Sequence, residues 1–150
     1  MVLGIIFGVL FLALIIWLSV KYFVLIGANR IALNAFNIIH AQINKRYGLI
    51  LNRLDSCTDN QELASDTKNL ILKALEFSLV KDGTERIIRF ANAIFDNIEN
   101  LSITIEDDSD YNSAKTHYNT SVKELRHYVD VFPTSLMARM LRIKFLDSLK

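Results

Sequence analysis

The chain has 150 residues, of which 51% are hydrophobic and 22% charged, and its formal net charge at pH 7 is +1. A protein so close to neutral lacks the excess of Lys and Arg that nucleic acid phosphates require, so we expect no nucleic acid partner. Five Gly and one Pro are too few for the many tight turns of a β-sandwich or β-barrel, which favours an all-α fold. The single Cys57 excludes an internal disulfide.

Residues 1–27 have the composition of a membrane span. Residues 1–20 read MVLGIIFGVLFLALIIWLSV without a charge, and the apolar run resumes after Lys21. About 20 such residues cross a hydrocarbon core of roughly 30 Å as a helix. Nothing basic precedes the run and aromatic residues such as Trp17 line its exit, so we interpret residues 1–27 as an uncleaved transmembrane signal-anchor.

Charged residues beside the span predict its orientation, and two glycines within it predict self-association. The flanking cations all follow the span, so the positive-inside rule places the N-terminus outside and the C-terminal domain in the cytoplasm. Gly4 and Gly8 form a G-x-x-x-G pair, a spacing that lets two membrane helices approach closely and form a homo-oligomer. Because Gly is common in membrane helices, the pair also fits an ordinary span.

Residues 28–150 show apolar residues every three or four positions, which predicts helices at about 28–54, 60–80, 85–105 and 110–131. Asp59 with Glu62 resembles the capping box of the second helix, and Asp110 is expected to cap the fourth. The expected core positions are Ala32, Phe36, Ile39, Ile43, Tyr47, Ile50 and Leu54; Leu63, Thr67, Leu70, Ala74 and Phe77; Ile87, Ala91, Ile94, Ile98, Leu101 and Ile105.

The fourth helix shows the heptad spacing of a coiled coil, with Tyr111, Tyr118, Leu125 and Phe132 at one position and Ala114, Ser121 and Tyr128 at the other. Phe132-Pro133 is expected to end this helix, because proline disfavours the helical conformation of the preceding residue. Four comparable helices on short loops predict an antiparallel up-down four-helix bundle.

A short amphipathic helix is expected to follow at 134–149. Its apolar stripe is Leu136, Met137, Met140 and Leu141, with Arg139, Arg142 and Lys144 around it. Two interpretations use the same residues. The stripe packs on the open end of the bundle, or it lies in the inner leaflet with the three cations on anionic lipid headgroups, which makes membrane lipids a partner.

Two blocks of sequence resemble the LemA family of small bacterial membrane-anchored helical proteins. The first block is Ala35, Phe36, Ile39, Gln42, Ile43, Lys45, Arg46, Tyr47, Leu49, Ile50, Asn52 and Leu54, similar in spacing to A-W-x-x-I-D-x-Q-L-x-R-R-x-D-L-I-P-N-L. The second is Tyr118, Asn119 and Val122, followed by Phe132, Pro133, Leu136 and Ala138, similar to the Y-N-x-A-V and F-P-S-N-x-x-A blocks.

The chain also departs from that pattern, which makes it similar to a divergent member. Phe36 stands for the family's Trp, His40 and Gly48 for its two Asp, and Leu51 for its Pro. The resemblance implies an antiparallel four-helix bundle on a bacterial inner-membrane anchor, without an established enzymatic activity for the family as a whole. Arg46, Tyr47, Tyr118, Asn119, Phe132 and Pro133 are the motif residues that it singles out.

Chemistry-bearing patterns are otherwise absent from the sequence. His40, His117 and His127 share no metal-ligand spacing, and no Gly-rich phosphate loop or nucleophile elbow occurs, so we expect no metal, no cofactor and no catalytic residues. The acidic run 106–110 lacks the EF-hand pattern and is interpreted as a solvated loop. Asn119 either sets the register of the heptad seam or faces solvent.

These patterns favour a non-catalytic, membrane-anchored helical bundle that acts as an interaction or scaffold subunit of a bacterial membrane assembly, with other membrane proteins as partners. One alternative is a membrane-remodelling or compartment-organising protein that uses its basic amphipathic tail. A second is an enzyme accessory or weak hydrolase that uses carboxylates such as Asp107 and Asp108.

Overall fold

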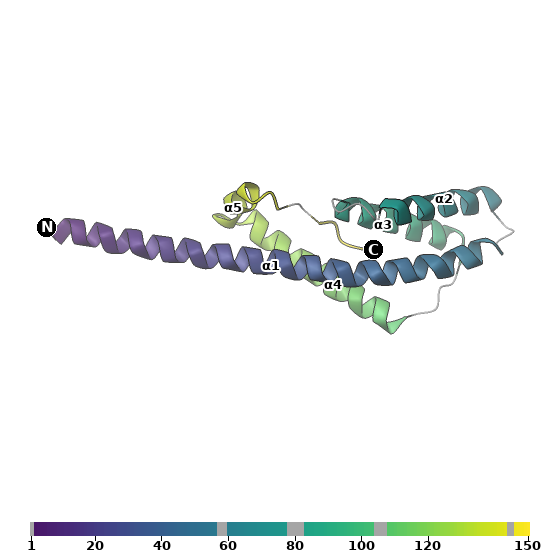
Figure 1. The fold of residues 1–150 in the computed structure, drawn as a ribbon, viewed down its shortest axis with the longest axis horizontal. Coiled ribbons are helices and arrows are strands. Elements are labelled where there is room, and N and C mark those ends of the chain that lie inside the picture. The colour runs from purple at the N-terminus through teal and green to yellow at the C-terminus, as the bar shows by residue number, and fades with distance from the viewer. Residues whose placement is uncertain (1, 57–59, 78–82, 104–107, 144–145) are drawn as a thin grey trace.

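The structure is a computed structural model that describes residues 2–56, 60–77, 83–103, 108–143 and 146–150. Over these ranges the protein is all-α, with five helices and no strand (Figure 1). One of them, at the N-terminus, is long and apolar enough to cross a membrane. The predicted all-α class and apolar N-terminal helix are therefore confirmed.

Helix α1 runs without interruption from Val2 to Leu54. A helix of 53 residues is about 80 Å long at 1.5 Å per residue, and no proline interrupts it. The span predicted to end at residue 27 and the helix predicted to start at residue 28 are continuous in the structure. The whole predicted core face of α1, from Ala32 to Leu54, is buried.

Helices α2 (Gln61–Phe77) and α3 (Thr84–Asn100) pack against each other as a hairpin. Asn60 begins α2, since its Oδ1 accepts a hydrogen bond from the Leu63 N–H at 3.3 Å, whereas the predicted cap Asp59 lies outside the described residues. The main chain closes α3 at Ser102, which adopts the left-handed conformation (φ 51°) while the Ile103 N–H bonds to the Ile98 carbonyl.

The buried face of α2 is rotated from the predicted one. Thr67 and Ala74 are buried as expected. Leu63, Leu70 and Phe77 are only partly buried, and the core positions beside them are taken by Ala64 and Ile71. Both stripes have helical spacing, so the spacing alone does not select one of them. The predicted α3 positions Ile87, Ala91, Ile94 and Ile98 are all buried, and Ile105 lies outside the described residues.

Helices α4 (Ser109–Asp130) and α5 (Thr134–Met140) meet at a sharp turn. The cap of α4 is Asp108, whose side chain accepts from the Asp110 N–H at 3.0 Å, so the prediction that Asp110 is the cap was wrong by two residues. The heptad positions from Tyr111 to Leu125 are buried, but Phe132 is 76% exposed. Because α4 ends at Asp130, Phe132 leaves the heptad and its predicted place in the core was wrong.

The helix predicted over 134–149 is correct only for its first half. Helix α5 ends at Met140, where Arg142 takes the left-handed conformation (φ 51°) and the Ile143 N–H bonds to the Ala138 carbonyl. Residues 146–150 contain no helix. Two of their side chains, Leu146 and Leu149, belong to the core.

The helices pack as two pairs, α1 with α4 and α2 with α3, and α5 lies against both α4 and α1. Figure 1 shows the C-terminal segment running back from α5 and ending between α3 and the α1–α4 pair. A single apolar core joins all five helices and this segment. The N-terminal part of α1 extends beyond the other helices as a separate arm.

Candidate functional site

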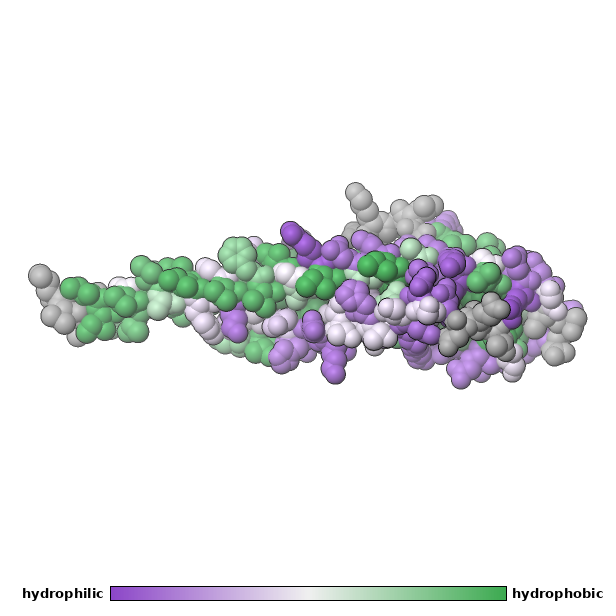
Figure 2. All heavy atoms as spheres, turned by 90° about the horizontal axis from the view of Figure 1, so that it is seen from below, coloured by the Kyte–Doolittle hydropathy of each residue, from purple (hydrophilic) through white to green (hydrophobic). Residues whose placement is uncertain are grey.

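The N-terminal half of α1 exposes apolar side chains on all sides. Phe7, Leu10 and Phe23 are 67%, 61% and 71% exposed, and from Ile5 onward the first buried side chain is that of Leu25. Figure 2 shows this apolar arm at one end of the molecule and the hydrophilic residues gathered at the other. From Val2 to Val24 the helix is about 35 Å long, which matches the thickness of a bilayer's hydrocarbon core.

The predicted self-association pair lies in this arm. Gly8 has no heavy atom within 4 Å of the place where a Cβ would lie, so its surface is open to a second helix. Gly4 lies in the same helix, but its exposure is not among the features that the structure describes.

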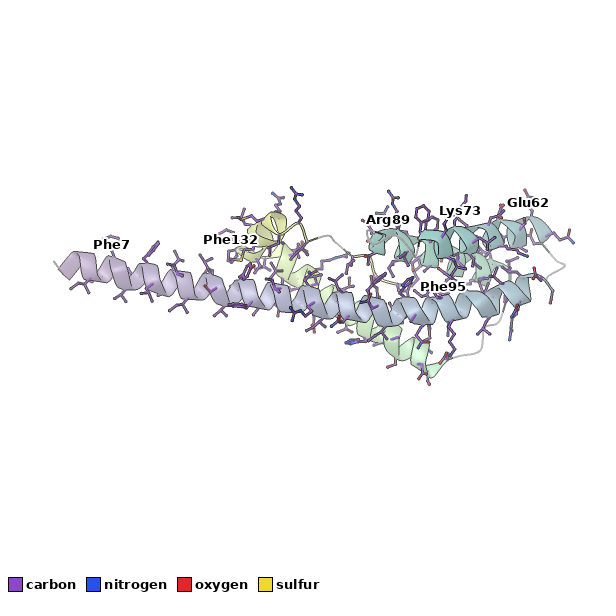
Figure 3. All side chains as sticks on the ribbon, in the orientation of Figure 1. Phe7, Glu62, Lys73, Arg89, Phe95 and Phe132 are labelled. Atoms are coloured by element: carbon purple, nitrogen blue, oxygen red, sulfur yellow. The ribbon has the colours of Figure 1, made fainter. Side chains whose placement is uncertain are left out.

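A second apolar surface lies at the turn between α4 and α5. Phe132, Leu136 and Met140 are 76%, 57% and 78% exposed, although their neighbours Pro133 and Ala138 are buried. Figure 3 places Phe132 at the end of this turn that faces the N-terminal arm of α1. Because α5 packs on α1, this surface lies where the exposed apolar arm ends.

Two of the three predicted membrane-surface cations lie beside this apolar surface. Arg139 and Arg142 are exposed and line a shallow pocket of about 490 Å³ together with Phe132 and Leu136. Lys144 lies outside the described residues. Apolar side chains flanked by exposed guanidinium groups form the kind of surface that binds the boundary between acyl chains and anionic headgroups.

Near the N-terminal end of α4, the motif residues Arg46 and Tyr47 meet Tyr111. The Arg46 guanidinium carbon lies 3.5 Å from the centroid of the Tyr111 ring, a cation–π contact. Burial raises the pKa of Tyr111 to about 12, although the Arg46 charge acts in the opposite direction. Burial, reinforced by Tyr111, also raises the pKa of Tyr47, so both phenols stay neutral at physiological pH.

The buried polar atoms Tyr47 Oη and Arg46 Nε have no hydrogen-bond partner. Arg46 instead covers an aromatic face and lines a pocket of about 430 Å³ with Phe95, Lys115 and Lys150.

The three histidines differ in their exposure. His40 is half-buried, stacks on Phe36 at 5.4 Å between ring centroids, and has its Nε2 3.3 Å from the Asn44 amide nitrogen. Burial lowers the pKa of His40 below its usual value. His117 and His127 are exposed on α4.

Motif residues Tyr118 and Asn119 lie on α4 and bind the C-terminal segment. The Tyr118 hydroxyl donates to the Asp147 carbonyl at 2.8 Å, and the Asn119 amide bonds both main-chain groups of Leu149 at 2.8 Å. Neither interpretation offered for Asn119 describes this role. A second asparagine, Asn92 on α3, binds Ser148 and Lys150 in the same way and was missed, because no spacing in the sequence marks it.

The carboxylates considered for hydrolysis have structural contacts where they can be described. Asp108 caps α4 and pairs with Lys45 Nζ at 3.4 Å. The hydrogen bond from the Asp110 N–H to the Asp108 carboxylate lowers the pKa of Asp108, and the nearby Lys45 charge acts in the same direction. Asp107 lies outside the described residues. Within the described ranges, no three His, Cys, Asp or Glu side chains gather in a way that could hold a metal ion.

No protein-family model matches the chain, and searches of curated proteins and of solved structures found no similar protein.

Proposed function

We propose that this protein is a non-catalytic, membrane-anchored helical protein that acts as an interaction or scaffold subunit of a bacterial membrane assembly. The observation that carries the proposal is the continuity of α1, whose first half exposes apolar side chains all round and whose second half forms the core. A helix without a break holds the folded part at a fixed distance from the membrane. Partners recruited to it are thereby positioned at the bilayer.

The proposal includes the orientation with the N-terminus outside and residues 28–150 in the cytoplasm, at the inner membrane. A C-terminal alkaline phosphatase fusion should then be inactive, and a C-terminal fluorescent-protein fusion should be bright. An active phosphatase fusion would reverse the orientation.

The proposal also includes divergent membership of the LemA family, on the resemblance of the two sequence blocks. It is supported by the roles of the motif residues, because Tyr118 and Asn119 bind the C-terminal segment and Arg46 covers Tyr111. Substituting these residues should therefore impair folding or assembly rather than a chemical step.

Affinity purification from detergent-solubilised membranes, followed by mass spectrometry, tests the scaffold function. We expect one or a few proteins at constant stoichiometry with the full chain. A variant that carries Ala13→Arg in the span is the matched control, because it retains residues 28–150 but should lose membrane positioning. Recovery of the chain alone from several growth conditions would contradict the proposal.

A second candidate function, membrane remodelling, is favoured by the exposed apolar surface of α5. Phe132 and α5, which carries Leu136 and Met140, lie near the end of the apolar arm, where these exposed side chains can enter the headgroup layer. The same surface also supports simple docking of α5 on lipid. Remodelling differs from docking in that it deforms vesicles.

An environment-sensitive fluorophore on Met140→Cys tests lipid contact, in a Cys57→Ser background and with the full chain in nanodiscs. Brominated lipid should quench the fluorophore at position 140 but not at Leu72→Cys, an exposed site on α2 that serves as the control. Replacing Arg139, Arg142 and Lys144 with Gln should weaken quenching in anionic lipid only. Equal quenching at both sites, or no quenching at position 140, would contradict contact between α5 and the membrane.

A further inference from the structure

The C-terminal segment Leu146–Lys150 lies between α3 and α4, and two asparagine side chains hold its main chain. Asn119 Nδ2 donates to the Leu149 carbonyl and Asn119 Oδ1 accepts from the Leu149 N–H, both at 2.8 Å. Asn92 Nδ2 donates to the Ser148 carbonyl at 3.1 Å and its Oδ1 accepts from the Lys150 N–H at 2.8 Å. Each amide therefore satisfies one carbonyl and one N–H, as a neighbouring β-strand would.

Two further side chains of α4 bind the same main chain. Tyr118 Oη donates to the Asp147 carbonyl at 2.8 Å, and an Arg126 guanidinium N–H donates to the Leu146 carbonyl at 3.2 Å. The carbonyls of four consecutive residues are thus bound by side chains of the helices. Contacts to main-chain groups do not depend on which residues the segment carries, so they give affinity for any extended chain.

The side chains of the segment define a short pattern. Leu146 and Leu149, three positions apart, are 6% and 2% exposed, whereas Ser148 between them is exposed. Asp147 pairs with Arg89 Nε on α3 at 3.3 Å. The pattern that the surface accepts is therefore a leucine, an acid, any residue and a second leucine.

A charged pair follows the second leucine, since Lys150 Nζ lies 2.8 Å from Asp96 Oδ2 on α3. The two helices that hold the segment belong to different packed pairs, α2 with α3 and α1 with α4. Helix α3 touches α4 through the Phe95 and Tyr111 rings, 6.0 Å apart. Without the segment, the two asparagine amides would lose main-chain partners, and such groups favour a replacement ligand.

We infer that this surface of α3 and α4 is a binding site for an extended peptide, and that Leu146–Lys150 is its intramolecular occupant. The ligand is a segment of a partner protein with two leucine-sized residues three positions apart, an acid after the first and a base after the second. The inference rests on the proposed scaffold function, which requires a partner protein. It adds the chemistry of the segment by which that partner binds. A tethered occupant competes at high effective concentration, so the partner must itself be concentrated at the membrane.

A nicked protein tests the inference without compromising folding. A site-specific protease sequence inserted between Ile143 and Lys144, after the Ile143 N–H that closes α5, lets the full chain fold in detergent with its own segment bound, before the chain is cut there. A fluorescent peptide that contains LDSLK should then exchange into the cut protein, as followed by fluorescence polarisation. A peptide with Asp in place of both leucines should not bind, and the uncut protein should bind the LDSLK peptide much more weakly.

Substitution of Asn119 tests whether the added peptide binds to the surface of α3 and α4 that holds the C-terminal segment. Asn119→Ala removes two hydrogen bonds to the peptide main chain and should weaken binding by about thirty-fold. Asn52→Ala, at an exposed position of α1, is the matched control and should leave binding unchanged. Equal affinity for the Asn119 and Asn52 variants would overturn the inference, as would loss of the helical circular dichroism signal when the cut segment is removed.

Exchange of segments between two copies is the competing outcome. One copy carrying Asp96→Cys and another carrying Lys150→Cys, both with Cys57→Ser, would then be joined by a short bismaleimide cross-linker, and this interchain product would replace the partner by a second copy and overturn the inference. Absence of an interchain product, with exchange of the free peptide, supports it. Peptide exchange without co-purifying proteins would contradict the proposed function alone, and co-purification without exchange would contradict this inference alone.

Discussion

The two halves of α1 belong to one continuous helix but have opposite surroundings. In the first half Phe7 and Leu10 are 67% and 61% exposed, whereas in the second half Ile39 and Ile43 are fully buried. The sequence of the first half is apolar on every face, but that of the second half is apolar on one stripe and polar on the others. Uniform apolarity suits lipid, which surrounds a helix, and a stripe suits a protein core, which covers one side.

Leu25 marks the change between the two environments, and α5 packs on α1 in the same region. The helix continues without a break through this point, so the exposed apolar half and the half that packs in the core belong to one helix. Changes confined to one half should therefore affect one property, either membrane insertion or folding stability, and leave the other unchanged. This expectation can be tested by placing matched substitutions in the two halves.

The largest effect is expected from truncating a buried residue of the second half. Ile39→Ala removes a fully buried side chain and should lower the free energy of unfolding by about 2–5 kcal/mol. Its sequence neighbour Ile38 is 52% exposed, so Ile38→Ala is the matched control and should have little effect. Chemical denaturation followed by circular dichroism measures both. Equal destabilisation would mean that the side of α1 assigned to the core is wrong.

A charge in the first half should affect membrane insertion instead. Ala13→Arg places a guanidinium near the middle of the arm and should cost about 2.5–3.5 kcal/mol of insertion free energy. The same charge in the second half, as Asn37→Arg at an exposed position, should leave insertion unchanged. Alkali extraction of membranes measures the retained fraction. Full retention of the Ala13→Arg variant would show that residues outside the arm provide the anchoring.

The sequence predicted the features that depend on local periodicity. The apolar arm and the buried face of α1 from Ala32 to Leu54 are visible as runs and stripes, and both agree with the structure. On α2 the choice between Leu63 and Ala64 could not be made in this way. Both stripes have helical spacing, and the approach of the neighbouring helix decides between them.

The features that sequence reasoning missed depend on contacts between distant residues. The segment 146–150 has the composition of an amphipathic helix but lies extended, because Asn92 and Asn119 bind its main chain from two helices. An asparagine that binds main-chain groups carries no periodic signal. The exposure of Phe132 was missed for a related reason, since the heptad was extended past the residue at which α4 ends.

A smaller effect, dependent on pH, is expected from His40 in the second half of α1. Burial lowers the pKa of His40 in the folded protein below 6.5, so the unfolded chain binds more protons as the pH falls. The contribution of His40 to stability is present above pH 6.5 and is lost as the pH falls through the lower folded value. The Asn44 amide can donate to Nε2 only while that nitrogen is unprotonated.

His40→Gln should therefore reduce the loss of melting temperature between pH 7.5 and pH 5, relative to the unmodified protein. Carboxylates also titrate in this range, so the difference between the two proteins is the quantity that reports on His40. His117→Gln, at an exposed position of α4, is the control and should follow the unmodified protein. If the melting temperatures of the unmodified protein, His40→Gln and His117→Gln depend on pH in the same way, His40 does not contribute to the loss of stability in acid.

The smallest effect compares the same substitution in both halves. Gly48 lies in the helical interior of the second half and has no heavy atom within 4 Å of the place that a Cβ would occupy, so Gly48→Ala should raise the free energy of unfolding by about 0.5–1 kcal/mol through helix propensity. Gly8 has equally open space, but Gly8→Ala lies in the arm and should leave that free energy unchanged. If Gly4 and Gly8 bring two arms together, Gly8→Leu should instead lower the fraction of cross-linked dimer in membranes, while Gly48→Leu should not. Stabilisation by Gly8→Ala would show that the arm unfolds together with the core and that the two halves are not energetically separate.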